Sequence, residues 1–177
     1  MTLKMTYFGN PILRKKAAPI DEITDEIKDI AAEMVEVMRA QKGIGLAAPQ
    51  VGLGIRLFII CVDHEDEEGE VVLGEPRVFI NPILKNGSQE QVERSEGCLS
   101  IPELRAPVMR PLTIDVEALD LEGNRFEIKG AYGFLARVIM HENDHLNGVL
   151  FIDRIKGKQR AQLEPFLRKI KKEYKDK

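Results

Sequence analysis

The sequence predicts an α+β fold, in which antiparallel or mixed strands pack around a central helix, with an N-terminal and a C-terminal helix completing the domain. Apolar residues recur at helical spacing in three segments, whereas shorter apolar or alternating runs lie mainly between the first two. Strands grouped between helices, without regular alternation, argue against a doubly wound parallel sheet. A chain of 177 residues can bury one hydrophobic core, so we expect a single domain over residues 1–177.

The first helix is expected to begin after Thr24, because threonine is a favoured N-cap residue. Asp25 and Glu26 follow, and their negative charges suit the positive end of the helix dipole. Gly43 marks the expected end. The predicted buried stripe of this helix consists of Ile27, Ile30, Ala31, Met34 and Met38.

Residues 55–62 are largely apolar and predict a strand that is buried on both faces. The acidic residues 63–70 are expected to interrupt the sheet as a solvated loop, which places His64 at the surface. Residues 78–80 predict a short strand that ends in a turn at Asn81-Pro82.

The second half of the chain predicts a hairpin followed by two helices. Residues 112–119 alternate between apolar and polar side chains, and residues 120–124 turn this strand back into residues 125–129. A helix is expected over residues 132–147, ending at Gly148. The last helix is predicted to bury one stripe made of Leu163, Phe166, Leu167, Ile170 and Tyr174.

Composition argues against several classes of function. A net charge of −3 does not fit a nucleic-acid-binding protein, which normally carries a basic excess, so we expect no DNA partner. The longest purely apolar stretch, residues 57–62, is too short to cross a bilayer, and the first ten residues contain no long apolar core. We therefore expect a cytoplasmic protein without membrane contact, in which Cys61 and Cys98 are free thiols or metal ligands.

The strongest single motif is HENDH at residues 141–145, an instance of H-E-x-x-H on the predicted second helix. Residues four apart lie on the same helix face, so His141 and His145 can reach one metal ion. Glu142 lies one residue round the helix, where it can approach a water molecule held by that ion. The segment therefore predicts a metal site with its own proton acceptor.

A five-residue match alone also fits a helix whose histidines face solvent or pack in the core. Phe134 and Val138 precede His141 and His145 at spacings i, i+4, i+7 and i+11, so apolar side chains share their face. This arrangement favours a partly apolar pocket beside the metal, as a catalytic site requires.

A catalytic site of this kind usually has three protein ligands and one open position, so a third ligand is needed. Downstream the chain offers no further histidine, only carboxylates in stretches that we expect to be solvated. Upstream, Cys98 stands in a polar turn flanked by glycine, where a thiolate is accessible. Cys61 lies inside an apolar strand and is expected to be a buried structural thiol. Cys98 is thus the favoured third ligand.

Three short segments follow one another along the chain: GIGLAAPQ at residues 43–50, EGCLS at residues 96–100 and HENDH at residues 141–145. In identity, order and spacing they resemble the motifs of the peptide deformylase family. The resemblance extends from NPIL at residues 10–13 to the helix after Asp153. It implies an enzyme that removes the formyl group from the N-terminal methionine of nascent polypeptides and releases formate.

The resemblance also implies one divalent metal ion, held by Cys98, His141 and His145. One thiolate and two imidazoles suit Fe(II), Zn(II), Ni(II) and Co(II). The family often uses Fe(II), so we expect iron in the cell and Zn(II), Ni(II) or Co(II) as alternatives in the isolated protein.

Further roles are implied for residues around that ion. Glu142 would act as general base and acid when metal-bound water attacks the formyl carbon. Gln50 and the backbone N–H of Leu99 would stabilise the oxyanion. The expected substrate contacts, made by backbone groups or by the apolar face of the helix, come from Ile44, Gly45, Gly97, Phe134 and Val138.

Several alternatives stay open from the residues alone. A zinc endopeptidase shares the helix motif but needs a third ligand downstream, and a non-enzymatic metal-binding protein has no chemical need for Glu142 and Gln50. Arg137 is expected near the methionine pocket, where it can pair with a carboxylate or alter the rim. The basic C-terminal residues predict a solvated helix face, and a weak ribosome contact is a second hypothesis for them.

Overall fold

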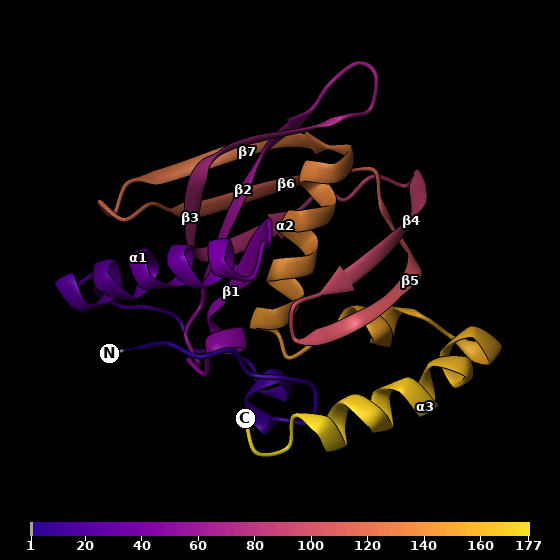
Figure 1. The fold of residues 1–177 in the computed structure, drawn as a ribbon. Coiled ribbons are helices and arrows are strands. Elements are labelled where there is room, and N and C mark those ends of the chain that lie inside the picture. Colours follow the sequence, from indigo (N-terminus) through magenta and orange to yellow (C-terminus); the bar gives the residue numbers. More distant parts are fainter. Residues whose placement is uncertain (1) are drawn as a thin grey trace.

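A computed structural model describes residues 2–177. Helix α2 runs through the middle of the molecule, with a five-stranded sheet on one side and a two-stranded hairpin on the other (Figure 1). The strand order is β1-β2-β3-β6-β7 in the larger sheet and β4-β5 in the smaller, and these strands pair antiparallel. The predicted α+β fold with a central helix and a helix near each end of the chain is therefore confirmed.

The elements follow one another in an order that brings the three motif segments together. Their bounds are η1 Pro11–Arg14, α1 Asp25–Ala40, β1 Gly45–Ala47, η2 Ala48–Val51, β2 Leu57–Glu65, β3 Val71–Lys85, β4 Gln91–Cys98, β5 Ile101–Pro111, β6 Thr113–Leu119, β7 Arg125–Tyr132, α2 Gly133–Leu146, η3 Phe151–Arg154 and α3 Gly157–Glu173. None of the helices within residues 2–177 is long and apolar enough to cross a membrane.

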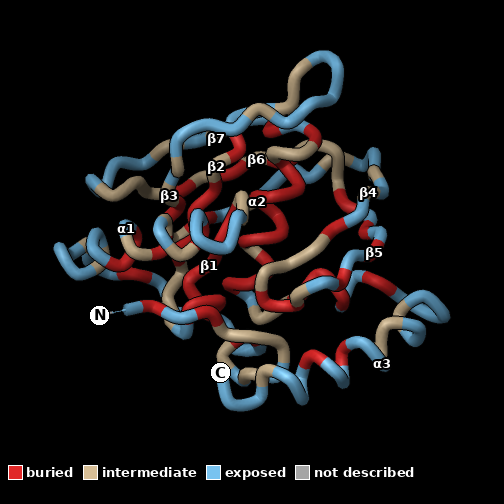
Figure 2. Tube along the Cα trace, in the orientation of Figure 1, coloured by how far each residue is buried: buried red, intermediate tan, exposed pale blue. Residues whose placement is uncertain are grey.

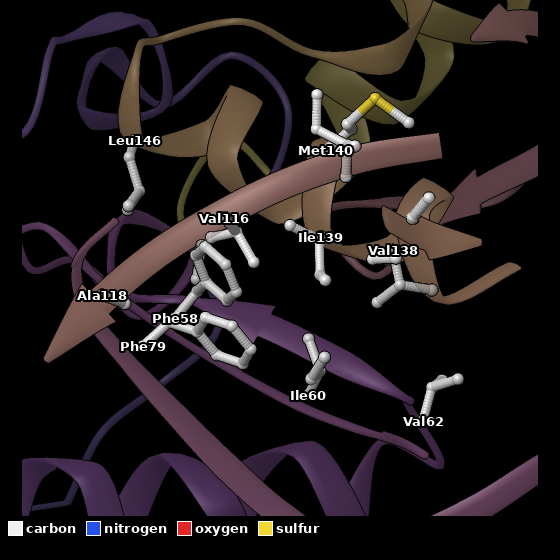
Figure 3. Packing of buried hydrophobic residues seen from close by; sticks show 14 of the residues in the cluster. Phe58, Ile60, Val62, Phe79, Val116, Ala118, Val138, Ile139, Met140 and Leu146 are labelled. Atoms are coloured by element: carbon white, nitrogen blue, oxygen red, sulfur yellow. The ribbon is translucent and has the colours of Figure 1, made fainter. Parts of the chain in front are cut away.

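Strand β2 is buried on both faces, as predicted, because each face meets a different helix. Phe58 and Ile60 point to α2, where the Phe58 ring stacks on Phe79 at 4.7 Å between centroids and the cluster continues into the helix (Figure 3). Leu57 and Ile59 point the other way and pack with α1. The alternation of side chains along a strand therefore makes this sheet the middle layer between two helices.

Helix α1 begins as predicted, since the Thr24 hydroxyl accepts a hydrogen bond from the Ile27 backbone N–H at 3.3 Å. Its buried side chains include Ile30, Met34 and Met38, whereas Ile27 is only half-buried. Helix α2 is the most deeply buried helix, and α1 and α3 each show an exposed outer side (Figure 2). Helix α2 thus carries its side chains into the interior rather than to the surface.

The prediction that residues 63–70 interrupt the sheet is wrong. Strand β2 continues to Glu65 and pairs with β3 from Val71, so only residues 66–70 form the loop of a hairpin. The charges misled the prediction because Asp63 and His64 are exposed on this part of the strand, whereas the Glu65 carboxylate is directed inward to the start of α2. His64 is exposed, as expected.

Two further features of the sheets also differ from the prediction, the end of one strand and the presence of a hairpin. The strand at residues 78–80 does not end at Asn81-Pro82 but continues to Lys85, because Asn81 adopts a positive φ of 50° and the pairing with β6 shifts register there. The hairpin β4–β5 was not predicted. Charged side chains on one face and prolines in β5 hide its alternation, which is visible in the buried Leu104, Ala106 and Val108.

Helix α3 packs on β5 and η3 through Leu167 and Ile170. Phe166 does not join them, and 58% of its surface is exposed, which contradicts the predicted stripe. At about 100° per residue it lies off the line through Leu163, Leu167 and Ile170, at the edge of the apolar face. Cys61 is also less buried than expected: its side chain is half-buried and packs against the cluster that joins β2 to α1.

The N-terminus of α2 is held by Glu65 at the end of β2. The Glu65 carboxylate accepts the Phe134 backbone N–H at 2.7 Å and pairs with Arg94 of β4 at 2.6 and 3.1 Å. The hydrogen bond from Arg94 is the main reason why the pKa of Glu65 is lowered, and the Phe134 N–H acts in the same direction. Gly133 has a positive φ of 62°, which strains residues with a side chain, and a Cβ there would also displace this carboxylate, so glycine is favoured at the junction.

We predict that Glu65→Gln lowers the free energy of unfolding by about 1–2 kcal/mol at pH 7, because a charged helix cap is lost. Since the folded-state pKa is depressed, the stabilisation is present above the unfolded value of about 4.3 and disappears as the pH falls through the folded value. Denaturant titrations from pH 7 to pH 3 check this, with Glu67→Gln in the exposed loop as the control. An equal loss at both ends of that range would contradict it.

Candidate metal centre and active site

Three metal-ligating side chains converge between α2 and the end of β4. Cys98 is the last residue of β4, and His141 and His145 lie one turn apart on α2. Their ligand atoms all lie within 4.8 Å of one another, and Cys98 Sγ is 3.3 Å from His145 Nε2. The structure therefore brings together the three residues that the sequence marked as ligands.

The protonation and orientation of these groups fit a cation. His141 Nδ1 lies 2.8 Å from the Glu96 carboxylate, which leaves its Nε2 facing the other two side chains. Burial opposes a charge on His141, but its contacts with Cys98 and Glu96 raise its pKa well above the ordinary value, so its second proton occupies the place that a metal ion would take and would be displaced by that ion. His145 has the opposite balance, because burial lowers its pKa and keeps its imidazole neutral. One sulfur and two nitrogens form a donor set that suits a divalent transition metal.

Glu142 is buried beside the ligands, and its Oε2 has no hydrogen-bond partner among residues 2–177. Burial is the main reason why its pKa is raised to about 7, against the opposing influence of His141. Its space depends on Gly45 of β1, since a Cβ there would lie 2.6 Å from Glu142 Oε1. An unpaired carboxylate of this kind is suited to accept and release a proton near neutral pH.

Gln50 reaches the same centre from the short helix η2. Its Oε1 accepts the Ala47 backbone N–H at 2.9 Å, which turns the Nε2 toward the ligands. That nitrogen lies 3.4 Å from Cys98 Sγ and 3.2 Å from Ser100 Oγ. The amide is therefore fixed as a hydrogen-bond donor at the edge of the metal centre.

A cavity of about 690 Å³ opens onto this centre. Two strand edges border it, since β1 pairs only with β2 and β4 pairs only with β5 in the described chain. Every substrate contact expected from the sequence lines the cavity, as does Leu99; these contacts are Ile44, Gly45, Gly97, Phe134 and Val138. An extended peptide can add as a strand between two such edges.

Glu96, the first residue of the EGCLS motif, was not predicted to have a role, but it lies at the centre of a buried charge network. Glu96 accepts hydrogen bonds from Arg110 at 2.6 and 3.0 Å and from Arg137 at 2.5 Å, in addition to its contact with His141. Burial opposes its ionisation, but His141 and Arg110 outweigh that effect and lower its pKa far below the ordinary value. A carboxylate two residues before a cysteine ligand is a local signal that could have revealed this role.

Of the two possibilities considered for Arg137, the structure shows pairing with a carboxylate, that of Glu96. Only 4% of its surface is exposed, and besides Glu96 it donates to the backbone carbonyls of Val92 and Val108 at 2.6 and 2.9 Å. Asp144 is also buried, and it bridges Arg110 at 2.9 Å and Arg154 at 2.6 and 2.7 Å. The charges behind the ligands therefore form one connected network.

Downstream carboxylates do not approach the centre. Asp153 pairs with Arg14 and caps the Leu150 N–H, and Glu164 pairs with Arg160 on the same helix face. The third ligand of an endopeptidase would have to come from this region. The ligand geometry therefore favours the upstream thiol of Cys98.

An open cavity with a buried carboxylate beside a cluster of one cysteine and two histidines is the arrangement expected of a metal-dependent hydrolase. A family model described as polypeptide deformylase matches residues 2–161. The chain therefore belongs to the peptide deformylase family. It is an enzyme, a hydrolase of N-formyl peptides, and the family together with the Cys98, His141 and His145 cluster indicates a single metal ion.

Individual relatives cover most of the chain. The peptide deformylase of Treponema pallidum strain Nichols is 41% identical over 158 residues, 89% of this chain and 91% of that protein. The peptide deformylase of Picosynechococcus sp. strain PCC 7002 is 44% identical over 155 residues, 88% of this chain and 80% of that protein.

Solved structures agree in fold. Peptide deformylase 1B of Arabidopsis thaliana matches with a TM-score of 0.86 at 36% identity, covering 98% of this chain and 93% of that chain. The peptide deformylase of Ehrlichia chaffeensis matches with a TM-score of 0.86 at 33% identity, covering 99% of this chain and 98% of that chain.

We predict that Glu96→Gln weakens metal binding by about 10- to 100-fold, because the carboxylate that orients His141 is lost. It also leaves two buried guanidinium groups poorly compensated, which is expected to cost about 3–5 kcal/mol of unfolding free energy. Chelator competition and denaturant titration measure the two effects. Glu93→Gln, an exposed change on the same strand, serves as the control. Unaltered metal affinity in Glu96→Gln would refute the orienting role.

Proposed function

We propose that residues 1–177 form a single catalytic domain that hydrolyses the N-formyl group of the N-terminal formylmethionine of newly synthesised polypeptides and releases formate. The observation that carries the proposal is the unpaired carboxylate of Glu142 beside three convergent ligand atoms, at the base of a cavity between two strand edges. This arrangement supplies a proton acceptor, a cation site and two strand edges that can pair with a peptide backbone, all at one place.

The metal ligands in this proposal are Cys98, His141 and His145. A bound divalent cation supplies Lewis acidity and lowers the pKa of water from 15.7 towards about 7. One thiolate and two neutral imidazoles leave the site with a net positive charge, so that acidity is retained. We propose Fe(II) as the ion in the cell, with Zn(II), Ni(II) or Co(II) able to take its place in the isolated protein.

Glu142 moves the protons. Its carboxylate accepts a proton from the attacking water and delivers it to the departing amine, a role matched by its pKa of about 7. Gly45 keeps the space around Oε1 open, so the carboxylate can change its hydrogen-bond partner during the reaction. The proton therefore travels along one side chain from the water to the leaving group.

The oxygen of the formyl group gains negative charge as water adds to its carbon. The Nε2 amide of Gln50 and the backbone N–H of Leu99 donate hydrogen bonds to it in this mechanism. Loss of one such donor typically lowers the rate by about 10²- to 10³-fold. Because Ala47 and Ser100 already orient the Gln50 amide, little reorganisation is needed when the charge develops.

The substrate binds as an extended strand between Ile44–Gly45 and Gly97, where backbone groups can pair with it. Its methionine side chain lies against Phe134 and Val138. Arg137 tolerates this apolar neighbour because its charge is already compensated by Glu96 and two carbonyls.

The decisive experiment compares wild type with Glu142→Gln under anaerobic conditions, with Fe(II), Zn(II), Ni(II) or Co(II) supplied in turn. We expect wild type to release formate from a formyl-Met peptide. The variant should keep its metal but lose about 10²- to 10⁴-fold in kcat, since general acid–base catalysis is removed. Metal analysis of both proteins and of Cys98→Ala, which should bind no stoichiometric metal, is the control. Wild type that releases no formate with any of these ions would defeat the proposal.

The substrate also suggests where the enzyme works. Nascent formylmethionyl chains emerge during translation, so we propose that the protein acts in the cytoplasm, next to the ribosome. Residues 156–177, mostly helix α3, contain nine Lys or Arg and three Asp or Glu, whereas the rest of the chain contains 17 and 26. This local basic excess supports a weak electrostatic contact with ribosomal RNA.

We expect Lys169→Glu/Lys172→Glu to weaken co-sedimentation with ribosomes at low salt, while turnover of a formyl-Met dipeptide stays within about twofold of wild type. Both lysines are exposed on α3. The matched control reverses two exposed lysines elsewhere, Lys28 and Lys129. Equal ribosome binding by wild type and both double variants would rule out the contact.

A further inference from the structure

The two proposed oxyanion donors come from separate parts of the fold. Gln50 belongs to η2, which directly follows β1 of the larger sheet, whereas Leu99 follows β4 of the smaller sheet. No strand of one sheet pairs with a strand of the other in the described chain. An oxyanion hole works only when its donors stand at hydrogen-bond distance from the developing charge. The contacts that join these two segments therefore bear directly on its geometry.

Residues 6–8, the N-terminal link, join the two segments through backbone hydrogen bonds. The Thr6 N–H donates to the Gln50 carbonyl at 2.7 Å. Two residues later, the Phe8 N–H donates to the Ser100 carbonyl at 2.8 Å. The link thus contacts the residue that carries one proposed donor and the residue that follows the other.

Side chains anchor the link on both sides. Just before it, Met5 is buried in the cluster that joins β2 to α1 and that includes Ala48 of η2. At its end, Phe8 packs on the cluster that joins the β4–β5 hairpin to α3. The Thr6 hydroxyl also donates to the Pro49 carbonyl at 2.9 Å. The link therefore bridges two packing units of the molecule as well as two loops.

The Gln50 side chain closes the same connection from the inside. Its Nε2 donates to Ser100 Oγ at 3.2 Å and lies 3.4 Å from Cys98 Sγ, and Gln50 and Ser100 are both buried. Gln50 and Ser100 are thus joined twice, directly through their side chains and indirectly through the link. An amide nitrogen has two hydrogens, so the bond to Ser100 leaves one for the formyl oxygen.

We propose that the N-terminal link and Ser100 are positioning groups, which set where the Gln50 amide stands relative to the Leu99 N–H. The inference rests on the deformylase function proposed above. Neither group touches the reacting atoms. Their loss should lower kcat, because the charge on the formyl oxygen develops only in the transition state, and should leave KM and metal content nearly unchanged.

A proline at position 8 removes one hydrogen bond of the link. The Asn10 N–H donates to the Tyr7 carbonyl at 2.9 Å and Gly9 has a φ of 104°, so residues 7–10 form a β-turn whose second position accepts proline. Phe8→Ala loses the same ring but keeps the N–H. With formyl-Met-Ala as substrate, we expect kcat of Phe8→Pro to be about tenfold below that of Phe8→Ala, with KM and metal content within about twofold.

A double-mutant cycle tests the direct bond. Ser100→Ala should lower kcat by about three- to tenfold, but it should have almost no further effect in a Gln50→Ala background, because it acts through that amide. The matched control is Glu67→Pro, at the second position of the exposed turn closed by the Gly69 N–H and the Asp66 carbonyl, and we expect it to keep the wild-type kcat.

Equal kcat in Phe8→Pro and Phe8→Ala would overturn the role of the link. A loss from Ser100→Ala that has the same size with and without Gln50, or that accompanies a loss of metal, would show a purely structural role and overturn the proposal. If Phe8→Pro does not fold, the cycle of Ser100 and Gln50 decides the question. Failure of wild type to release formate from formyl-Met-Ala would instead overturn the proposed function itself.

Discussion

The buried carboxylate of Glu96 is the interaction on which the rest of the site depends. It accepts hydrogen bonds from His141 and Arg137 of α2 and from Arg110 of β5, so one side chain ties the β4–β5 hairpin to the central helix. A lone buried carboxylate would be strongly unfavourable, but here two guanidinium groups and an imidazole keep it ionised. Because Cys98 follows two residues later on the same strand, β4 supplies one of the proposed metal ligands and orients a second. A shift of register between β4 and β5 would move Arg110 away from Glu96.

The second constraint is the meeting of two strand edges around the cavity. Strand β1 ends the larger sheet and β4 pairs only with β5 in the described chain, so each has an unpaired backbone edge, and residues of both strands line the cavity. Recognition of backbone suits an enzyme whose substrates share only their first residue. Gly45 serves both purposes, since its missing Cβ exposes the edge of β1 and leaves room for Glu142. The proposed general base and the proposed peptide-binding edge are therefore linked through a single glycine.

Local patterns predicted well which residues come together around the cavity and predicted some of the strands poorly. The helix carrying His141 and His145 was expected over residues 132–147 and runs from Gly133 to Leu146, because helical spacing is a local property. The hairpin β4–β5 escaped prediction, since its inward side chains include Glu96 and Arg110, which a hydrophobic pattern counts as surface residues. The same reason explains the error at residues 63–70, where the charge of Glu65 is directed inward to cap α2. Charged residues that form ion pairs with one another in the interior leave no hydrophobic periodicity in the sequence.

By itself the sequence determined the chemistry: a histidine pair four residues apart, a glutamate beside it and an accessible cysteine, together with the three motifs that mark the family. These features depend on residue type and short spacing, which the chain carries without reference to its fold. Only the tertiary structure decided which distant groups serve them, namely Glu96 behind His141 and Glu65 at the start of α2. Contacts between residues 45 and 69 positions apart arise from how all the elements pack against one another, so no local pattern could specify them.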